Sequence, residues 1–429
     1  MSHRVATVAS LIAVVAIGGV SVRAQDGGPA VTLPAPGAPC VAIGFLYEHV
    51  DADGAWLAPD IARALAAVRC ARAQAAAPQL AVSVHVDDEV TAVAAAGKRA
   101  DASALAGFAA AFASVPGGDD ELARAIAAAA LAMDDARHVL PGGELAAAAR
   151  AALAPVGQVP AGPTALLALT PAALRQLAAA PRRTLTGCAG DAGLDVLELA
   201  RSGQRVDLPS RLAAASAAPA APALAADSAI AAAVHRRVDQ PFVAAAFAVP
   251  ADLDRAALAV ALTVARDRAA RRWQLRGSEL RAGTPFVDWS WLRGDRVVAF
   301  HRRGLAPIRV RPGEPAADVA AERDATAAEL REFLDDLRRP VAETEVAAAR
   351  AQAAAELGCQ VRADASDPAT VALGLRQALL RRVRGVDDGA IAAVAPAAVT
   401  AALARLLAGP QCWQALLPTP SPSLGWRPR

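Results

Sequence analysis

The sequence predicts an α+β fold made of two homologous domains, each a mostly antiparallel sheet packed by helices. Two observations lead to this prediction. The chain repeats one order of motifs with a period of roughly 200 residues, which indicates an internal duplication. Within each half, short apolar or alternating segments come in runs and long Ala-rich helical segments come in other runs, an order typical of α+β domains.

Three pairs of segments carry the duplication. In the first pair, an apolar strand is followed by an acidic turn and a long helix. The second pair is a helix rich in Glu and Ala. The third pair is a helix followed by a segment that ends at a cysteine. The pairs are anchored at Cys40 and Phe242, at Glu144 and Glu345, and at Cys188 and Cys412. The growing offset between copies predicts an insertion of about two dozen residues in the second half, within the largely helical segment 359–385.

Composition changes along the chain predict its organisation. A short basic start, an apolar run and small residues before Ala24 form the pattern of a secretory signal peptide. Left uncleaved, the same run would anchor the chain in a membrane. An Ala-, Pro- and Ser-rich stretch separates the two halves. The expected segments are a signal peptide at 1–24, an N-terminal domain at 36–210, a linker at 211–232, a C-terminal domain at 233–417 and a disordered tail at 418–429.

Hairpins and helices are expected in each half. In the first half, alternating segments from Gln79 and from Val90 predict two strands joined by a polar turn. In the second half, alternation from Phe286 and an Arg-Gly-Asp turn predict another hairpin. A helix from Ala316 is expected to stop at Pro340, because proline cannot continue a helix.

Charge and cysteine content exclude several classes of protein. The net charge is +2 and the two signs are interspersed, so no nucleic-acid-binding stripe is expected. No cysteine belongs to a CxxC pair, which excludes the usual cysteine zinc and redox motifs. An exported location would permit one or two disulfides and leave at least one thiol unpaired. The five cysteines are Cys40, Cys70, Cys188, Cys359 and Cys412.

The order of motifs resembles the insulinase/pitrilysin family of zinc peptidases, which includes the mitochondrial processing peptidases. The resemblance is best in the second half, in the segments that start at Asp239, Arg271 and Pro340. The family's unit is also a pair of homologous α+β domains. The resemblance therefore implies two domains arranged like the halves of a clam.

Active members of the family carry His-x-x-Glu-His on the first helix. Histidines four apart on one helix face bind zinc, and the glutamate takes a proton from the metal-bound water. Counted from Gly54, the histidine positions hold Leu57 and Ile61, and the glutamate position holds Asp60. Leucine and isoleucine cannot ligate zinc, so the sequence predicts no catalytic residue and no cofactor, although the resemblance implies zinc.

Two further features count against a metal site. Pro59 predicts that the helix starts near Ala58, which leaves Leu57 off the helix face. The family's third ligand is a glutamate from a later helix. The corresponding segment of this chain offers Glu144 near its start and only alanines where a ligand is needed.

The family's C-terminal domain often holds the substrate backbone with an Arg and a Tyr. Arg281 and Phe286 lie in the corresponding region and are the candidate substrate-binding residues, with Arg276 an equal match for the arginine. The chain's single tyrosine is Tyr47, far from this region. The spacing is also shorter than in the family, so the sequence leaves substrate clamping open.

Other polar groups have both a functional and a structural interpretation. Glu48, His49, Asp51 and Asp53 could form a metal-binding turn, but acidic residues before a helix also stabilise its N-terminus. Asp134 and His138 have ligand spacing, but a histidine near a helix C-terminus is stabilised by the dipole. Trp289 and Trp291 could line a binding surface or lie under the helices. The remaining candidates, for which a structural role is expected, are His85, His235 and His301.

The sequence thus favours an exported, non-catalytic homologue of these peptidases. It would be the partner subunit of an active peptidase and would help to enclose or bind an unfolded peptide, which could add as a strand to a sheet edge. One alternative is a stand-alone peptide-binding or structural envelope protein. The other is an active zinc endopeptidase with ligands recruited from His49, Asp134 and His138.

Overall fold

The computed structural model describes most of both halves of the chain. The described residues are 31–33, 37–51, 56–87, 89–114, 118–139, 145, 148–149, 151–153, 162–180, 182–190, 230–235, 240–250, 252–274, 286–288, 297–304, 319–356, 365–386 and 388–418. The predicted signal peptide lies outside them, as do most of the predicted linker, all but the first residue of the predicted tail, and both Trp289 and Trp291.

The chain forms two compact units, each built around one five-stranded sheet. The first contains the described residues within Met1–Met133, Pro160–Ala215 and Ala354–Asp388. The second contains those within Asp134–Val159, Ser216–Ala353 and Gly389–Arg429. Each unit therefore takes one segment from the other half of the sequence. The domain and linker bounds predicted above stay a prediction, although a strand begins at Ala231, inside the predicted linker.

The first sheet has the strand order β1-β5-β2-β4-β3. Only β1 runs parallel to its neighbour β5, and the other pairs are antiparallel. The strands are β1 (Val31–Leu33), β2 (Cys40–Asp51), β3 (Ala81–Val86), β4 (Val90–Lys98) and β5 (Arg182–Ala189). The helices of this half are α2 (Pro59–Ala76), α3 (Ala102–Ala113), α4 (Asp119–Val139), α6 (Gly162–Leu167) and α7 (Pro171–Ala179), with a short 3₁₀ helix at Arg99–Asp101.

The second sheet repeats this topology with the order β6-β10-β7-β9-β8, and again only its first pair is parallel. The strands are β6 (Ala231–His235), β7 (Phe242–Ala248), β8 (Phe286–Asp288), β9 (Val297–Arg303) and β10 (Gln411–Pro418). The helices of this half are α10 (Arg255–Gln274), α11 (Val319–Leu337), α12 (Glu343–Glu356), α13 (Pro368–Arg384), α14 (Asp388–Ala392) and α15 (Pro396–Ala408). The predicted α+β class and the two predicted hairpins, β3–β4 and β8–β9, are confirmed.

The element order corrects one part of the predicted duplication. The first and third pairs of segments match, because β2–α2 corresponds to β7–α10 and α7–β5 corresponds to α15–β10. The second pair is wrong: α12 follows α11 as α4 follows α3, so the helix at Glu345 corresponds to α4 and not to the segment at Glu144. The helix inside 359–385, α13, is likewise no insertion, because it corresponds to segment 145–153. The extra residues of the second half fall between α10 and α12.

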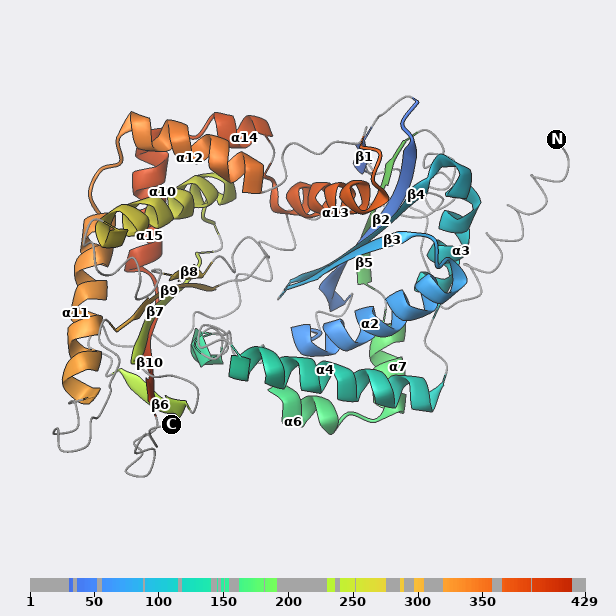
Figure 1. The fold of residues 1–429 in the computed structure, drawn as a ribbon, viewed down its shortest axis with the longest axis horizontal. Helices are drawn as coiled ribbons and strands as arrows, with labels where there is room; N and C mark the ends of the chain where they lie inside the picture. Colours follow the sequence, from blue (N-terminus) through green and yellow to red (C-terminus); the bar gives the residue numbers. More distant parts are fainter. Residues whose placement is uncertain are drawn as a thin grey trace, which may run out of the picture. The chain divides into compact units, whose positions relative to one another are not determined.

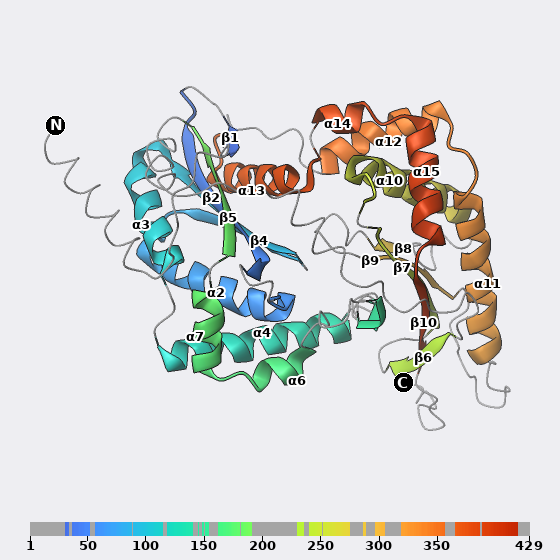
Figure 2. The ribbon, with the colours of Figure 1, turned by 180° about the vertical axis from the view of Figure 1, so that it is seen from behind.

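Each sheet is covered on one face by its own half's helices and on the other by the exchanged segment. In the first unit, α2 and α3 pack on one face through a cluster that includes Phe108, and α13 packs on the other through Leu375 and Leu379 (Figure 1). The helices α4, α6 and α7 gather beside α2 in both views (Figures 1 and 2). In the second unit, α11 covers one face, and helical residues of segment 145–153 contact the other through Leu145 and Leu153.

The ends of α13 are defined by its sequence. The carboxylate of Asp367 accepts hydrogen bonds from the backbone N–H groups of Ala369 and Thr370, and Pro368 occupies the first turn, where its missing N–H costs nothing. At the other end, Gly385 has φ +64°, the left-handed conformation that ends many helices. Between these ends, Val371, Leu375 and Leu379 are buried against the first sheet.

Two predictions about the environment of the chain can be compared with the structure. Within the described part of the chain, no helix is long and apolar enough to cross a membrane. The predicted possibility of disulfides is not realised among the described cysteines, because Cys40, Cys70, Cys188 and Cys412 are buried free thiols. Cys359 lies outside the described residues.

Candidate functional site

The positions expected to hold a zinc motif lie at the start of α2. The helix begins at Pro59 with Ala58 as its N-cap, as the proline predicted. Leu57 precedes the helix, and its backbone N–H donates to the His49 carbonyl over 2.8 Å. The residue at the first histidine position is therefore held by strand β2 and does not lie on the helix face.

An apolar cluster fills the space around these positions. Leu57 is 1% exposed and packs among Leu122 and Ile126 of α4 and Leu166 of α6. Ile61, at the second histidine position, packs against the same cluster. No polar atom of these side chains points into the cluster, because all of them are aliphatic. The residues present do not fit a zinc ion, which needs nitrogen, oxygen or sulfur ligands.

Asp60, at the position of the catalytic glutamate, has a structural role. Its side chain is nearly fully buried, and both of its oxygens accept hydrogen bonds. Oδ1 accepts from Arg63 Nη1 over 3.0 Å, and Oδ2 accepts from the Gly162 backbone N–H over 3.2 Å. Asp60 thus links the first turn of α2 to the start of α6, and an acidic side chain there also favours the helix N-terminus.

The segment that was expected to correspond to the family's third-ligand helix does not pack on Leu57. Segment 145–153, which follows Glu144, packs on the second sheet, whereas the helix that packs on Leu57 is α4. The acidic residues at the start of α4 face arginines: Asp119 pairs with Arg175, and Glu121 Oε1 lies 3.8 Å from Arg72 Nε. The helix presents aliphatic side chains to the cluster.

The alternative metal ligands are also placed by the structure. His49 is fully buried in β2, where its Nε2 lies 2.9 Å from Thr91 Oγ1 on β4. Asp134 and His138 lie on the last turns of α4, but their side chains are outside the described set. Among the side chains that the structure describes, no group of three or more His, Cys, Asp or Glu could hold a metal ion.

The substrate-binding candidates of the second half remain predictions. Arg281 and Arg276 lie outside the described residues. Phe286 begins β8, where its backbone pairs with His301 of β9, but its side chain is not among those described. His301 itself is buried, and this burial lowers its pKa to about 4, so its ring is neutral at pH 7. A neutral buried ring agrees with the structural role expected for it.

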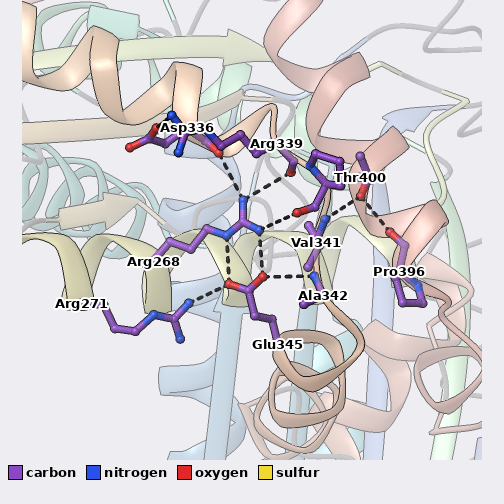
Figure 3. A network of polar contacts seen from close by, with 10 residues as sticks. Arg268, Arg271, Asp336, Arg339, Val341, Ala342, Glu345, Pro396 and Thr400 are labelled. Carbon is purple, nitrogen blue, oxygen red and sulfur yellow. Dashed lines mark hydrogen bonds and ion pairs between the residues drawn. The ribbon is translucent and has the colours of Figure 1, made fainter.

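In the second unit, α10 and α12 correspond to α2 and α4, and ion pairs join them. Arg268 of α10 donates from Nε and Nη2 to the two oxygens of Glu345 on α12, over 3.0 and 2.8 Å (Figure 3). Arg271 Nη2 donates to the same carboxylate over 2.7 Å. The hydrogen bonds from Arg268 hold the pKa of Glu345 down at about 2. In the second unit, α10 and α12 are therefore joined by an ion-pair network centred on Glu345.

A buried ion pair in the first unit was not predicted from the sequence. The sequence around Asp87, after β3, predicts an ordinary polar turn, yet its carboxylate is fully buried and lies 2.6 Å from Arg384 Nη2 at the end of α13. It also accepts from His85 Nε2 and from the backbone N–H of Val90. Arg384 lowers the pKa of Asp87 to about 2 against the opposing effect of burial. Nothing in the sequence links residues so far apart.

The fold matches solved structures of M16 peptidases, the insulinase/pitrilysin type. An M16-like peptidase from Alicyclobacillus acidocaldarius has a TM-score of 0.62 at 14% identity, over 92% of this chain and 98% of that one. A protease from Helicobacter pylori gives 0.62 at 15% identity, over 93% and 98%. A peptidase M16 inactive domain from Pseudomonas fluorescens gives 0.59 at 14% identity, over 93% and 98%. No protein-family model and no curated protein sequence matches the chain.

Proposed function

We propose, from the fold that this chain shares with M16 peptidases, that it is an exported, non-catalytic homologue of these enzymes that binds unfolded peptide as the partner of an active peptidase. The observation that carries the proposal is the apolar cluster around Leu57. A peptidase fold is kept, while the positions that would hold zinc are filled by packed aliphatic side chains.

Peptide binding needs no metal. Each of the two sheets ends in an edge strand, β3 in one and β8 in the other, and an extended peptide can add to such an edge through backbone hydrogen bonds. Arg281 and Phe286 are the proposed contacts of the second half. A chain that binds peptide without cleaving it can assist a peptidase that does the chemistry.

Structures with this fold also occur in assemblies. One similar chain belongs to Complex III2 from Candida albicans, at 13% identity and a TM-score of 0.57. Another, the periplasmic protease PqqL from Escherichia coli, is matched over 46% of its length with a TM-score of 0.53. These likenesses support an exported partner subunit as the working proposal, with an active M16 peptidase as the expected partner.

The test combines metal analysis with a cleavage assay on the purified mature chain. We expect no stoichiometric zinc and no chelator-sensitive cleavage of an unstructured reporter peptide. Zinc near one equivalent with chelator-sensitive cleavage would instead support the active peptidase that uses His49, Asp134 and His138.

The partner is tested separately. Affinity purification of the tagged chain from its native host should recover a protein that carries His-x-x-Glu-His. Recovery of peptide without any such protein would favour the stand-alone peptide-binding protein.

A further inference from the structure

The β3–β4 hairpin determines which backbone groups of β3 face its open edge. The Asp87 N–H donates to the Val90 carbonyl over 3.1 Å, so these residues form a hydrogen-bonded pair. Along an antiparallel ladder, such pairs alternate with pairs whose N–H and C=O groups point away from the partner strand. By the register of the hairpin, the backbone groups of Val86, Val84 and Val82 point away from β4, toward the edge.

An arginine from α13 contacts this edge. Arg376 Nη1 donates to the Val84 carbonyl over 2.8 Å. Within the described part of the chain, that carbonyl is its one polar partner, and its buried Nε has none. Burial lowers the pKa of Arg376, because desolvation disfavours the charged guanidinium. Among the residues that the structure describes, a positive charge without a carboxylate partner thus lies beside the edge of β3 that pairs with no other strand.

Exposed apolar side chains flank the same edge. Val84 is 40% exposed, and Leu373, one turn before Arg376 on α13, is 46% exposed. Val82 and Val86 pack against clusters formed with α2, so Val84 lies on that face of the sheet. A strand added to β3 would direct alternate side chains toward Val84 and toward α13.

We propose that Arg376 makes the β3 edge selective for acidic peptides. An extended segment pairs with β3, and its backbone N–H replaces the guanidinium at the Val84 carbonyl. The released guanidinium then binds an Asp or Glu side chain of the peptide on the face toward α13. This inference rests on the proposed peptide-binding function and adds the chemistry of the ligand to it.

Charge complementarity argues for a carboxylate as the occupant. A half-buried arginine held by one neutral carbonyl gains more from a carboxylate, since the carboxylate adds the attraction of an opposite charge and can accept two parallel hydrogen bonds from the guanidinium. The exchange also leaves no group unsatisfied, because the carbonyl of Val84 receives the peptide N–H as the arginine leaves.

The test measures binding of two labelled peptides to the full chain by fluorescence anisotropy. In one peptide Thr alternates with Glu, and in the other Gln replaces every Glu. We expect the wild-type chain to bind the Glu peptide about tenfold more tightly. Arg376→Gln should equalise the two affinities, whereas Arg376→Lys, which keeps the charge, should retain a preference.

Two matched variants complete the design. Arg382→Gln makes the same charge change at an exposed position of the same helix and should keep the preference. Val84→Pro removes an edge-facing N–H that β4 does not use, and it should abolish binding of both peptides.

The outcomes separate the two proposals. A preference that survives in Arg376→Gln, or equal affinities in the wild-type chain, would overturn the role of Arg376 and leave peptide binding intact. Undiminished binding to Val84→Pro would exclude the β3 edge as the site. If the wild-type chain binds neither peptide, the proposed function itself is wrong.

Discussion

Gly44 and Gly187 are paired directly across β2 and β5, and together they leave the space that Leu379 of α13 occupies. A Cβ atom at Gly44 would lie 2.7 Å from Leu379 Cδ1, and one at Gly187 would lie 3.1 Å from Leu379 Cδ2. Two glycines of the first half thus determine how closely a helix from the second half approaches the sheet.

The first prediction concerns Gly44→Ala. The added methyl group must displace Leu379 in a buried cluster, and overpacking of this kind costs typically about 1–3 kcal/mol. We expect the urea midpoint to fall by a corresponding amount at an unchanged slope.

Gly107→Ala is the matched control. Gly107 lies in α3, and nothing lies within 4 Å of a Cβ placed there. Alanine is the better helix former, so this variant should be stabilised by about 0.5–1 kcal/mol. The double variant Gly44→Ala/Leu379→Ala should show strong non-additivity. Additive effects of these two changes would contradict the contact.

The second prediction concerns Asp87→Asn. The change leaves Arg384 buried without its carboxylate, and breaking a buried pair costs about 3–5 kcal/mol. The wild-type chain should also lose about 2 kcal/mol of stability as pH falls from about 4 to about 2, because the pKa of Asp87 is lowered from its ordinary value to about 2 in the folded chain. Unfolding followed by circular dichroism across this range measures both effects.

Asp335→Asn supplies the comparison for this pair. Asp335 pairs with Arg338 on the surface, where the two side chains are 69% and 53% exposed. Exposed pairs contribute about 0–1 kcal/mol, so little change is expected. Equal effects of the two substitutions would show that the Asp87–Arg384 pair does not join α13 to the sheet.

The sequence predicted the fold class and the repeat because both depend on local pattern. Alternation predicted the strands, Pro59 predicted the start of α2, and two of the three repeat anchors hold in the structure. The exchange of helices was not predictable in this way. The apolar stripe of α13, which includes Leu375 and Leu379, shows that one face is buried but not which sheet buries it.

The site was predictable to a similar extent. Counting from Gly54 places Leu57, Asp60 and Ile61 at the expected motif positions, a prediction that needs only local spacing on a helix. The packing around these positions depends on contacts with α4, such as the one between Leu57 and Leu122, which are more than sixty residues apart in the sequence. The sequence offered Glu144 near the expected third-ligand position but predicted no ligand there, and the structure places the segment that follows it on the second sheet.

The third prediction concerns Glu345→Gln. The carboxylate joins α10 to α12 through Arg268, and its pKa in the folded chain is about 2 against an ordinary 4.5. A depressed pKa stabilises the folded chain above the ordinary value, and this stabilisation is lost as pH falls from about 4.5 to about 2. At pH 7 the substitution should cost about 2 kcal/mol.

Glu343→Gln tests whether this effect is specific. Glu343 lies in the same first turn of α12, so its interaction with the helix dipole is similar, but its side chain is 65% exposed beside Arg350. The expected loss is below about 0.5 kcal/mol. A Glu345→Gln variant that keeps the acid-dependent loss of the wild-type chain would show that other carboxylates cause it.

The last prediction concerns the cluster that carries the proposed function. Leu57→His places an imidazole among aliphatic side chains with no polar partner, which should destabilise the chain by about 3 kcal/mol. Leu131→His, at a position of α4 that is 62% exposed, should change stability by less than about 0.5 kcal/mol.

The double variant Leu57→His/Ile61→His then asks whether a metal site can be regained. Leu57 lies before the helix and is held by the backbone of β2, so the two imidazoles would not share the helix face that zinc needs. We expect no stoichiometric zinc by metal analysis and no rise in the unfolding midpoint when zinc is added. One equivalent of zinc with a matching rise would mean that the backbone at positions 57 and 61 can still present two ligands to one metal ion.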